Sequence, residues 1–101
     1  MQLARFLDKV FKKDGFILTD ANSKDYIIGN PGDNPIKLKI LNKSLHYKLL
    51  FHPDLYFGEA YTDGEIIIEN GTLTEFLDLA LMNFGRGELN FFSYLMNRFR
   101  G

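Results

Sequence analysis

The sequence contains no cysteine and no tryptophan, and only three of its 101 residues are proline. The lack of cysteine excludes disulfides, a thiolate nucleophile and the usual cysteine-bearing structural zinc site. It also permits a reducing compartment, so we expect a cytoplasmic protein. No apolar run approaches the 18 residues of a transmembrane helix. The first 15 residues lack the continuous apolar stretch of a secretory signal.

Motifs for phosphate and nucleic acid binding are missing as well. Neither of the two common glycine-rich phosphate loops occurs, and no basic patch is interleaved with aromatic residues. The formal net charge of -1 provides no overall attraction to nucleic acid. We therefore expect no nucleic acid partner.

The residues that are present are typical of one folded domain spanning residues 1–101. Apolar residues make up 46% of the chain and charged residues 25%, which is an ordinary globular composition. Ten phenylalanines and five tyrosines predict a core rich in aromatic rings.

The first 41 residues predict one helix followed by three strands. Apolar residues recur at helical spacing and predict an amphipathic helix ending near Gly15: Leu3, Phe6, Leu7, Val10 and Phe11. Segments 15–20 and 25–30 are typical of short strands joined by a turn, and the proline-rich segment 30–35 is expected to be a loop. Segment 36–41 alternates apolar residues with Lys37 and Lys39, which indicates a strand with one dry face. These lysines would protect a sheet edge if the strand lies at one.

The second half predicts mostly helices. Segment 43–51 suits a short helix stopped at Pro53, and Asp54 is a candidate cap for another helix through residues 55–64. Segment 65–70 reads as a strand, because consecutive isoleucines favour a pleated sheet. Thr72 and Glu75 have the spacing of a capping box before a helix that Gly85 would stop, and a last helix covers 89–99. The predicted class is α+β: a small antiparallel sheet of about four to five strands with helices packed on it.

Few residues suggest chemistry. Glu59 and Asp63 are spaced to share a helical face, as a carboxylate pair requires, but the alternative is a solvated helix end leading into the turn dipeptide Asp63-Gly64. His46 and His52 are six positions apart and share no helical face, so a two-histidine metal site is poorly supported. We predict no metal and no catalytic residue in this chain.

The C-terminal segment carries an excess of large apolar side chains. One interpretation is that they complete the core. The other is that they contact lipid or a partner, with arginine meeting phosphate head groups. The helix before it already supplies apolar residues for one face of a small sheet, so we expect part of this stripe to lie outside the core. The candidate contact residues are Phe91, Phe92, Leu95, Met96, Arg98 and Phe99.

The segment GEAYTDGEIIIENGTLTEFL, residues 58–77, resembles a conserved stretch in the N-terminal region of cyclopropane-fatty-acyl-phospholipid synthases. The pattern there is G-E-[SA]-Y-x-D-G, followed by a short strand and a leucine-containing helix. Thr62 stands where methionine is frequent. The matching residues are Gly58, Glu59, Ala60, Tyr61, Asp63 and Gly64.

This resemblance implies a function in lipid modification. The family consists of S-adenosylmethionine-dependent methyltransferases that act on phospholipid acyl chains, and its N-terminal domain is similar in plan to sterol-carrier-protein-2 folds. The resemblance therefore implies a non-catalytic N-terminal domain without a cofactor of its own. Its expected partners are a C-terminal methyltransferase domain that binds S-adenosylmethionine and a phospholipid or membrane surface, at the inner membrane face. A homodimer is a further partner that the resemblance leaves undecided. The alternative function is that of a stand-alone sterol-carrier-like lipid-binding or interaction module.

Overall fold

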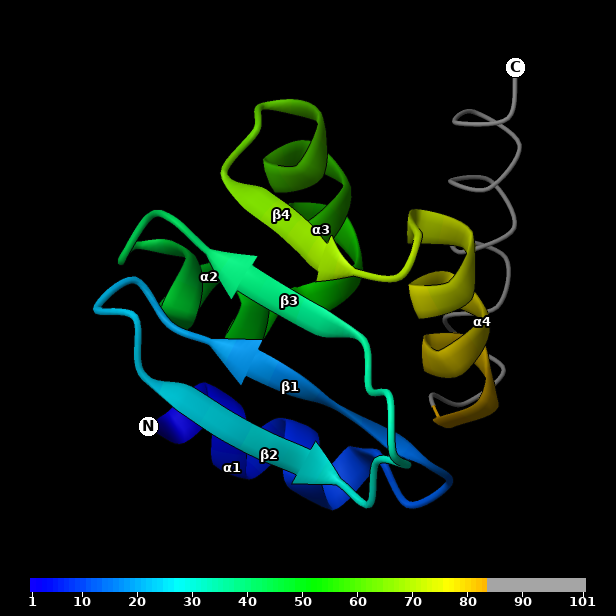
Figure 1. The fold of residues 1–101 in the computed structure, drawn as a ribbon. Helices are drawn as coiled ribbons and strands as arrows, with labels where there is room; N and C mark the ends of the chain where they lie inside the picture. Colours follow the sequence, from blue (N-terminus) through cyan, green and yellow to red (C-terminus); the bar gives the residue numbers. More distant parts are fainter. Residues whose placement is uncertain (84–101) are drawn as a thin grey trace.

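The computed structural model describes residues 1–83, and these form an α+β domain, as predicted (Figure 1). The predicted helix at 89–99 lies outside the described residues. So do the candidate contacts Phe91, Phe92, Leu95, Met96, Arg98 and Phe99. The elements in chain order are α1 (Gln2–Val10), β1 (Gly15–Thr19), β2 (Asp25–Gly29), β3 (Lys37–Ile40), α2 (Leu45–Phe51), α3 (Pro53–Thr62), β4 (Ile66–Asn70) and α4 (Leu73–Asn83).

The sheet is mixed, which corrects the prediction of an antiparallel sheet. Its strand order is β2-β1-β3-β4, and β1 pairs with β2 and β3 with β4 in antiparallel fashion, whereas β1 and β3 are parallel. The β1–β2 hairpin brings the chain back to the start of β1. The loop of residues 30–36 then carries it to the other side of β1, so β3 runs in the same direction as β1.

Position in the sheet also answers the question about the two lysines. Because β3 lies between β1 and β4, Lys37 and Lys39 are on an interior strand and protect no edge. Lys37 is aligned with Ile17, and Lys39 with Thr19 and Ile67. These side chains belong to the face of the sheet that we call the outer face.

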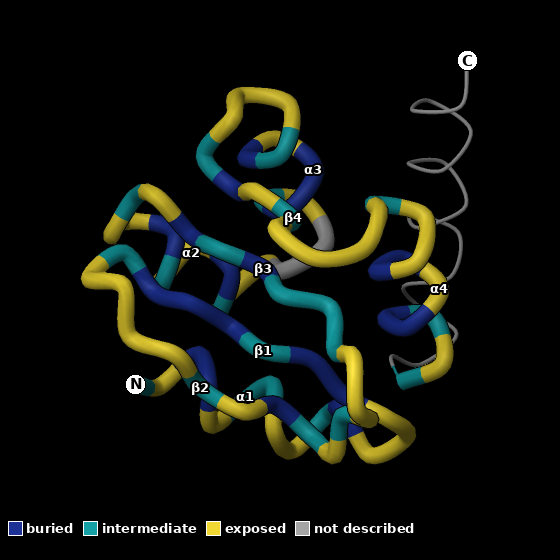
Figure 2. The backbone as a smooth tube through the Cα atoms, in the orientation of Figure 1, coloured by how far each residue is buried: buried dark blue, intermediate teal, exposed yellow. Residues whose placement is uncertain are grey.

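The core lies on the other, inner face of the sheet, where α1, α2 and α3 cover the strands (Figures 1 and 2). Phe16 is aligned with Ile28, Leu18 with Leu38, and Ile40 with Ile66. All six side chains are almost completely buried. Alternation along each strand thus separates the core from the outer face, as the sequence of β3 predicts.

Helix α4 is attached to the start of β1 and to the core. The side chain of Asn83 accepts a hydrogen bond from the Lys13 N–H at 2.8 Å and donates one to the Lys13 carbonyl at 2.9 Å. The Phe76 ring packs edge-on against Phe16, with ring centroids 5.1 Å apart. At the other end of α4, Thr72 and Glu75 form the predicted capping box, with reciprocal bonds of 2.9 and 3.1 Å.

Two predicted boundaries are wrong. Helix α1 ends at Val10 and not near Gly15, which is the first residue of β1. Helix α3 begins at Pro53, so Asp54 lies inside its first turn and does not cap it. Proline suits the first helical position because that position needs no N–H donor. His52 ends α2 and also precedes α3, so the two helices join at one residue.

Candidate functional site

The family-like segment at residues 58–64 forms the C-terminal end of α3. Asp63 is the last residue with helical backbone angles, and Gly64 follows with φ of 78°. The Gly64 N–H bonds to the Tyr61 carbonyl at 3.2 Å, and the Glu65 N–H bonds to the Ala60 carbonyl at 2.8 Å. These two bonds define a Schellman motif, which satisfies the last carbonyls of a helix. The segment therefore turns the chain from α3 into β4.

The acidic side chains of this segment differ in exposure from the residues beside them. Glu59 and Asp63 are both exposed, whereas Gly58 and Ala60 are buried and Tyr61 is half-buried. Within residues 1–83 no group of three or more histidines, cysteines or carboxylates is placed to hold a metal ion. The close spacing of these residues is explained by the helix end itself.

Glu65 connects the Schellman motif to the neighbouring elements. Its carboxylate accepts a hydrogen bond from the Asn42 side-chain amide at 3.1 Å, and its carbonyl accepts one from the Leu41 N–H at 2.8 Å. Asn42 in turn accepts a bond from the Ser44 N–H at 3.0 Å, just before α2. The segment thus holds the ends of α3, β3 and β4 and the start of α2 together.

The two histidines have separate surroundings. The Nε2 atom of His46 accepts a hydrogen bond from the Ala21 N–H at 3.4 Å, so α2 contacts the β1–β2 turn. His52 is exposed at the junction of α2 and α3, with its ring centroid 6.2 Å from that of Tyr56. The structure does not bring His46 and His52 together as a pair.

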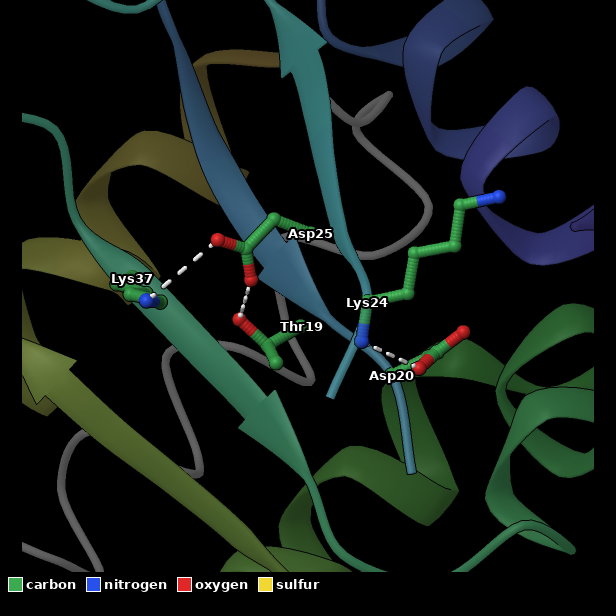
Figure 3. Close-up of polar contacts among 5 residues, drawn as sticks. All are labelled: Thr19, Asp20, Lys24, Asp25 and Lys37. Atoms are coloured by element: carbon green, nitrogen blue, oxygen red, sulfur yellow. Dashed lines mark hydrogen bonds and ion pairs between the residues drawn. The ribbon is translucent and has the colours of Figure 1, made fainter. Parts of the chain in front are cut away.

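Asp20 is a buried acid that the sequence analysis did not single out. It is only 5% exposed. Its Oδ1 atom accepts hydrogen bonds from the backbone N–H groups of Asn22 and Lys24, both at 2.9 Å, and its Oδ2 atom from the Tyr26 hydroxyl at 3.3 Å. Figure 3 shows the bond from Lys24. Burial raises the pKa of Asp20, but these bonds and the nearby His46 outweigh it and hold the pKa below its usual value. The sequence signal is an aspartate at the start of a turn, whose carboxylate can bind the N–H two residues on.

An apolar cavity of about 50 Å³ lies between the inner face of the sheet and the helices. It is partly enclosed, and every side chain lining it is apolar. Leu7, Leu49, Phe57 and Ala80 line it from α1, α2, α3 and α4, and the strands contribute Leu18 and Leu38. Apolar cavities of roughly 150 Å³ bind small hydrocarbons such as benzene. The cavity here has about a third of that volume.

The segment at residues 58–64 and the residues that line the cavity are therefore two different parts of the structure. The family-like segment is a helix end, and the cavity lies among core residues that helical and strand periodicity marked only as apolar. No helix within residues 1–83 is long and apolar enough to cross a membrane. No family model, curated protein or solved structure matches this chain.

Proposed function

We propose that this chain is a non-catalytic, lipid-handling domain of a methyltransferase like the cyclopropane-fatty-acyl-phospholipid synthases. In this role it receives the end of a phospholipid acyl chain and helps to orient the lipid for a separate catalytic domain. That domain binds S-adenosylmethionine. The cavity lined by Leu49, Phe57 and Ala80 is the observation that carries the proposal, because it is apolar and is lined by each of the four helices within residues 1–83.

The walls of the cavity favour a hydrocarbon ligand. Phe57 and Phe76 stack with ring centroids 5.2 Å apart, and Phe16 meets Phe76 edge-on. Binding a polar ligand there would leave its hydrogen-bonding groups without partners, at a cost that an acyl chain avoids. The cavity volume limits the bound part to the chain terminus unless the helices move apart.

The segment at residues 58–64 supports the same proposal because it ends α3, one of the helices that line the cavity. The Schellman motif at Gly64 sets how the chain passes from α3 into β4, and Phe57 and Ala60 are buried on α3. The segment thereby positions one wall of the cavity. A stand-alone sterol-carrier-like module is the second candidate, because the same cavity would serve it. A methyltransferase domain in the same reading frame distinguishes the first candidate from the second.

A binding measurement tests the proposal. The probe is a long-chain cis-unsaturated fatty acid carrying a fluorophore at its carboxyl end. We expect saturable binding that is weakened at least about tenfold by Ala80→Val, which fills the cavity, while the melting temperature is unchanged or raised. Leu7→Phe fills the cavity from another helix and should have the same effect. Ile27→Val, on the outer face of the sheet, is the matched control and should leave binding unchanged.

Two results would contradict the proposal. One is the absence of saturable binding by the wild-type chain. The other is unchanged affinity in folded Ala80→Val and Leu7→Phe variants, since the ligand would then bind elsewhere.

A further inference from the structure

Helices α2 and α3 form an elbow whose outer surface carries large apolar side chains exposed to solvent. Tyr47 is 64% exposed, Phe51 72% and Leu55 46%. We refer to Tyr47, Phe51 and Leu55, together with Lys43 and Lys48, as the elbow patch. Single exposed apolar residues are normal, but neighbouring ones on one surface indicate an interaction site.

The spacing along α2 explains why Tyr47 and Phe51 are neighbours. Leu45 and Leu49 face the core of the domain and are 2% and 6% exposed. Tyr47 and Phe51 are also four residues apart, so they lie one turn from each other on the opposite side of α2. Because α2 and α3 join at His52 without a loop, Phe51 lies at the junction and Leu55 on the first turns of α3.

The charge around the patch is positive on α2. Residues 42–52 contain Lys43 and Lys48 and no acidic residue, and both lysines are exposed. The next acidic residue along the chain is Asp54. The Nζ atom of Lys48 lies 5.6 Å from the centroid of the Tyr56 ring, so this ammonium is held beside the aromatic surface.

We propose that the elbow patch docks this domain on an anionic phospholipid surface. Phenylalanine and leucine side chains enter the boundary between head groups and acyl chains, tyrosine suits the head-group level, and lysines pair with lipid phosphates. The lysine stems lie along apolar surface while their ammonium groups stay in the polar layer. The proposal rests on the proposed function only for the class of partner, which is a phospholipid.

The position of the patch connects docking to the cavity. Leu49 of α2 and Phe57 of α3 line the cavity from the inner sides of the two helices whose outer sides carry the patch. A membrane in contact with the elbow would therefore lie against the two helices that form one wall of the cavity. This arrangement places the source of acyl chains next to the site proposed to receive them.

Vesicle co-sedimentation tests the docking surface. The full chain is mixed with vesicles of phosphatidylcholine and phosphatidylglycerol, or of phosphatidylcholine alone. We expect binding to the anionic vesicles, weakened at least about tenfold in the double variant Tyr47→Ala/Phe51→Ala. Both side chains are largely exposed, so the variant should keep its fold. Ile27→Ala removes an equally exposed apolar residue (68%) from the outer face of the sheet and should leave binding unchanged.

A charge variant measures the electrostatic contribution to vesicle binding. Lys43→Gln should weaken binding to anionic vesicles about fivefold, and the loss should shrink at high salt. Binding to phosphatidylcholine alone should be weak in both proteins. Equal binding by wild type and Tyr47→Ala/Phe51→Ala would overturn the proposal. So would a dimer that forms without lipid and is lost in the same variant, because the patch would then join two copies.

The two proposals fail in different ways. Unaltered vesicle binding by the elbow variant, with fatty acid binding still sensitive to Ala80→Val, removes the docking surface and leaves the proposed function. Vesicle binding through the elbow without any saturable fatty acid binding removes the cavity proposal and leaves the docking surface.

Discussion

The Nζ atom of Lys37 lies 3.6 Å from the Oδ2 atom of Asp25, although their strands are not neighbours in the sheet (Figure 3). Lys37 is on β3 and Asp25 on β2, with β1 between them. The lysine side chain reaches across β1, where the Thr19 hydroxyl donates a 2.7 Å hydrogen bond to the other oxygen of Asp25. The outer face of the sheet therefore carries a polar connection across three strands.

This ion pair should contribute little stability, because both side chains are partly exposed to solvent. We expect Lys37→Met and Asp25→Asn each to lower the free energy of unfolding by less than about 1 kcal/mol. Asp25→Ala should cost about 1–2 kcal/mol, because it also removes the acceptor of the buried Thr19 hydroxyl. Urea unfolding at low and high salt measures these differences. A loss in Lys37→Met as large as that in Asp25→Ala would show that the pair matters more than the hydroxyl.

Asp20 should make the stability depend on pH in the acid range. Its pKa in the folded state is below the usual value of 3.8, so its carboxylate stabilises the fold above that pH. The contribution is lost as the pH falls through the lower, folded-state pKa. We expect Asp20→Ala to cost about 2–3 kcal/mol at pH 7, because three donors lose a charged acceptor.

Urea titrations of wild type and Asp20→Ala at neutral and strongly acidic pH measure this dependence. The difference between the two proteins should narrow in acid. Asp20→Asn keeps an acceptor for the Asn22 and Lys24 N–H groups and should lie between them. A difference that stays constant across the pH range would contradict the assigned role of the carboxylate.

Gly64 should resist substitution for a reason that involves no contact. A Cβ atom there would have no neighbour within 4 Å, but its φ of 78° is unfavourable for any residue with a side chain. Gly64→Ala should cost about 1 kcal/mol, and Gly64→Val more than that. Gly32 has equally open surroundings without a positive φ, so Gly32→Ala is the matched control and should change stability little. Equal melting temperatures for Gly64→Ala and Gly32→Ala would remove the conformational argument.

Asn83 should hold α4 against the segment before β1. Its side chain bonds the N–H and carbonyl of Lys13 and also donates to the Leu79 carbonyl at 2.9 Å. Asn83→Ala should lower the free energy of unfolding by about 1–2 kcal/mol and reduce the hydrogen-exchange protection of the Lys13 amide. Asn83→Asp keeps the acceptor for the Lys13 N–H and should preserve more of that protection. Unchanged exchange at Lys13 in Asn83→Ala would show that α4 is held by its apolar contacts alone.

The 101-residue chain by itself should transfer no methyl group from S-adenosylmethionine to phospholipid. The expectation follows from the resemblance, in which a separate domain carries the glycine-rich cofactor loop, and from the lack of such a loop in this sequence. Incorporation of labelled methyl groups into unsaturated phospholipid is the measurement. Incorporation above that of a sample without protein would contradict the expectation.

Local patterns were sufficient to find the elements of the described fold. Periodicity predicts α1, β3 and α4, and turn residues, a run of isoleucines and candidate caps or stops predict the other five elements, although α1 ends at Val10 and not near Gly15. The capping box at Thr72 and Glu75 and the turn at Asp63-Gly64 were also visible in advance, since both depend on residues a few positions apart. The acidic appearance of residues 58–64 had the same local origin.

Strand pairing and burial depend on residues that are distant in the chain, and local patterns do not contain them. The 30–36 loop could place β3 beside β2 or beside β1, and only the tertiary structure shows the parallel pairing with β1. Asp20 is buried in the β1–β2 turn, where His46 of α2 accepts a bond from the Ala21 N–H. Phenylalanine is usually a core residue, yet Phe51 is exposed. Leu45 and Leu49 already occupy the side of α2 that faces the sheet.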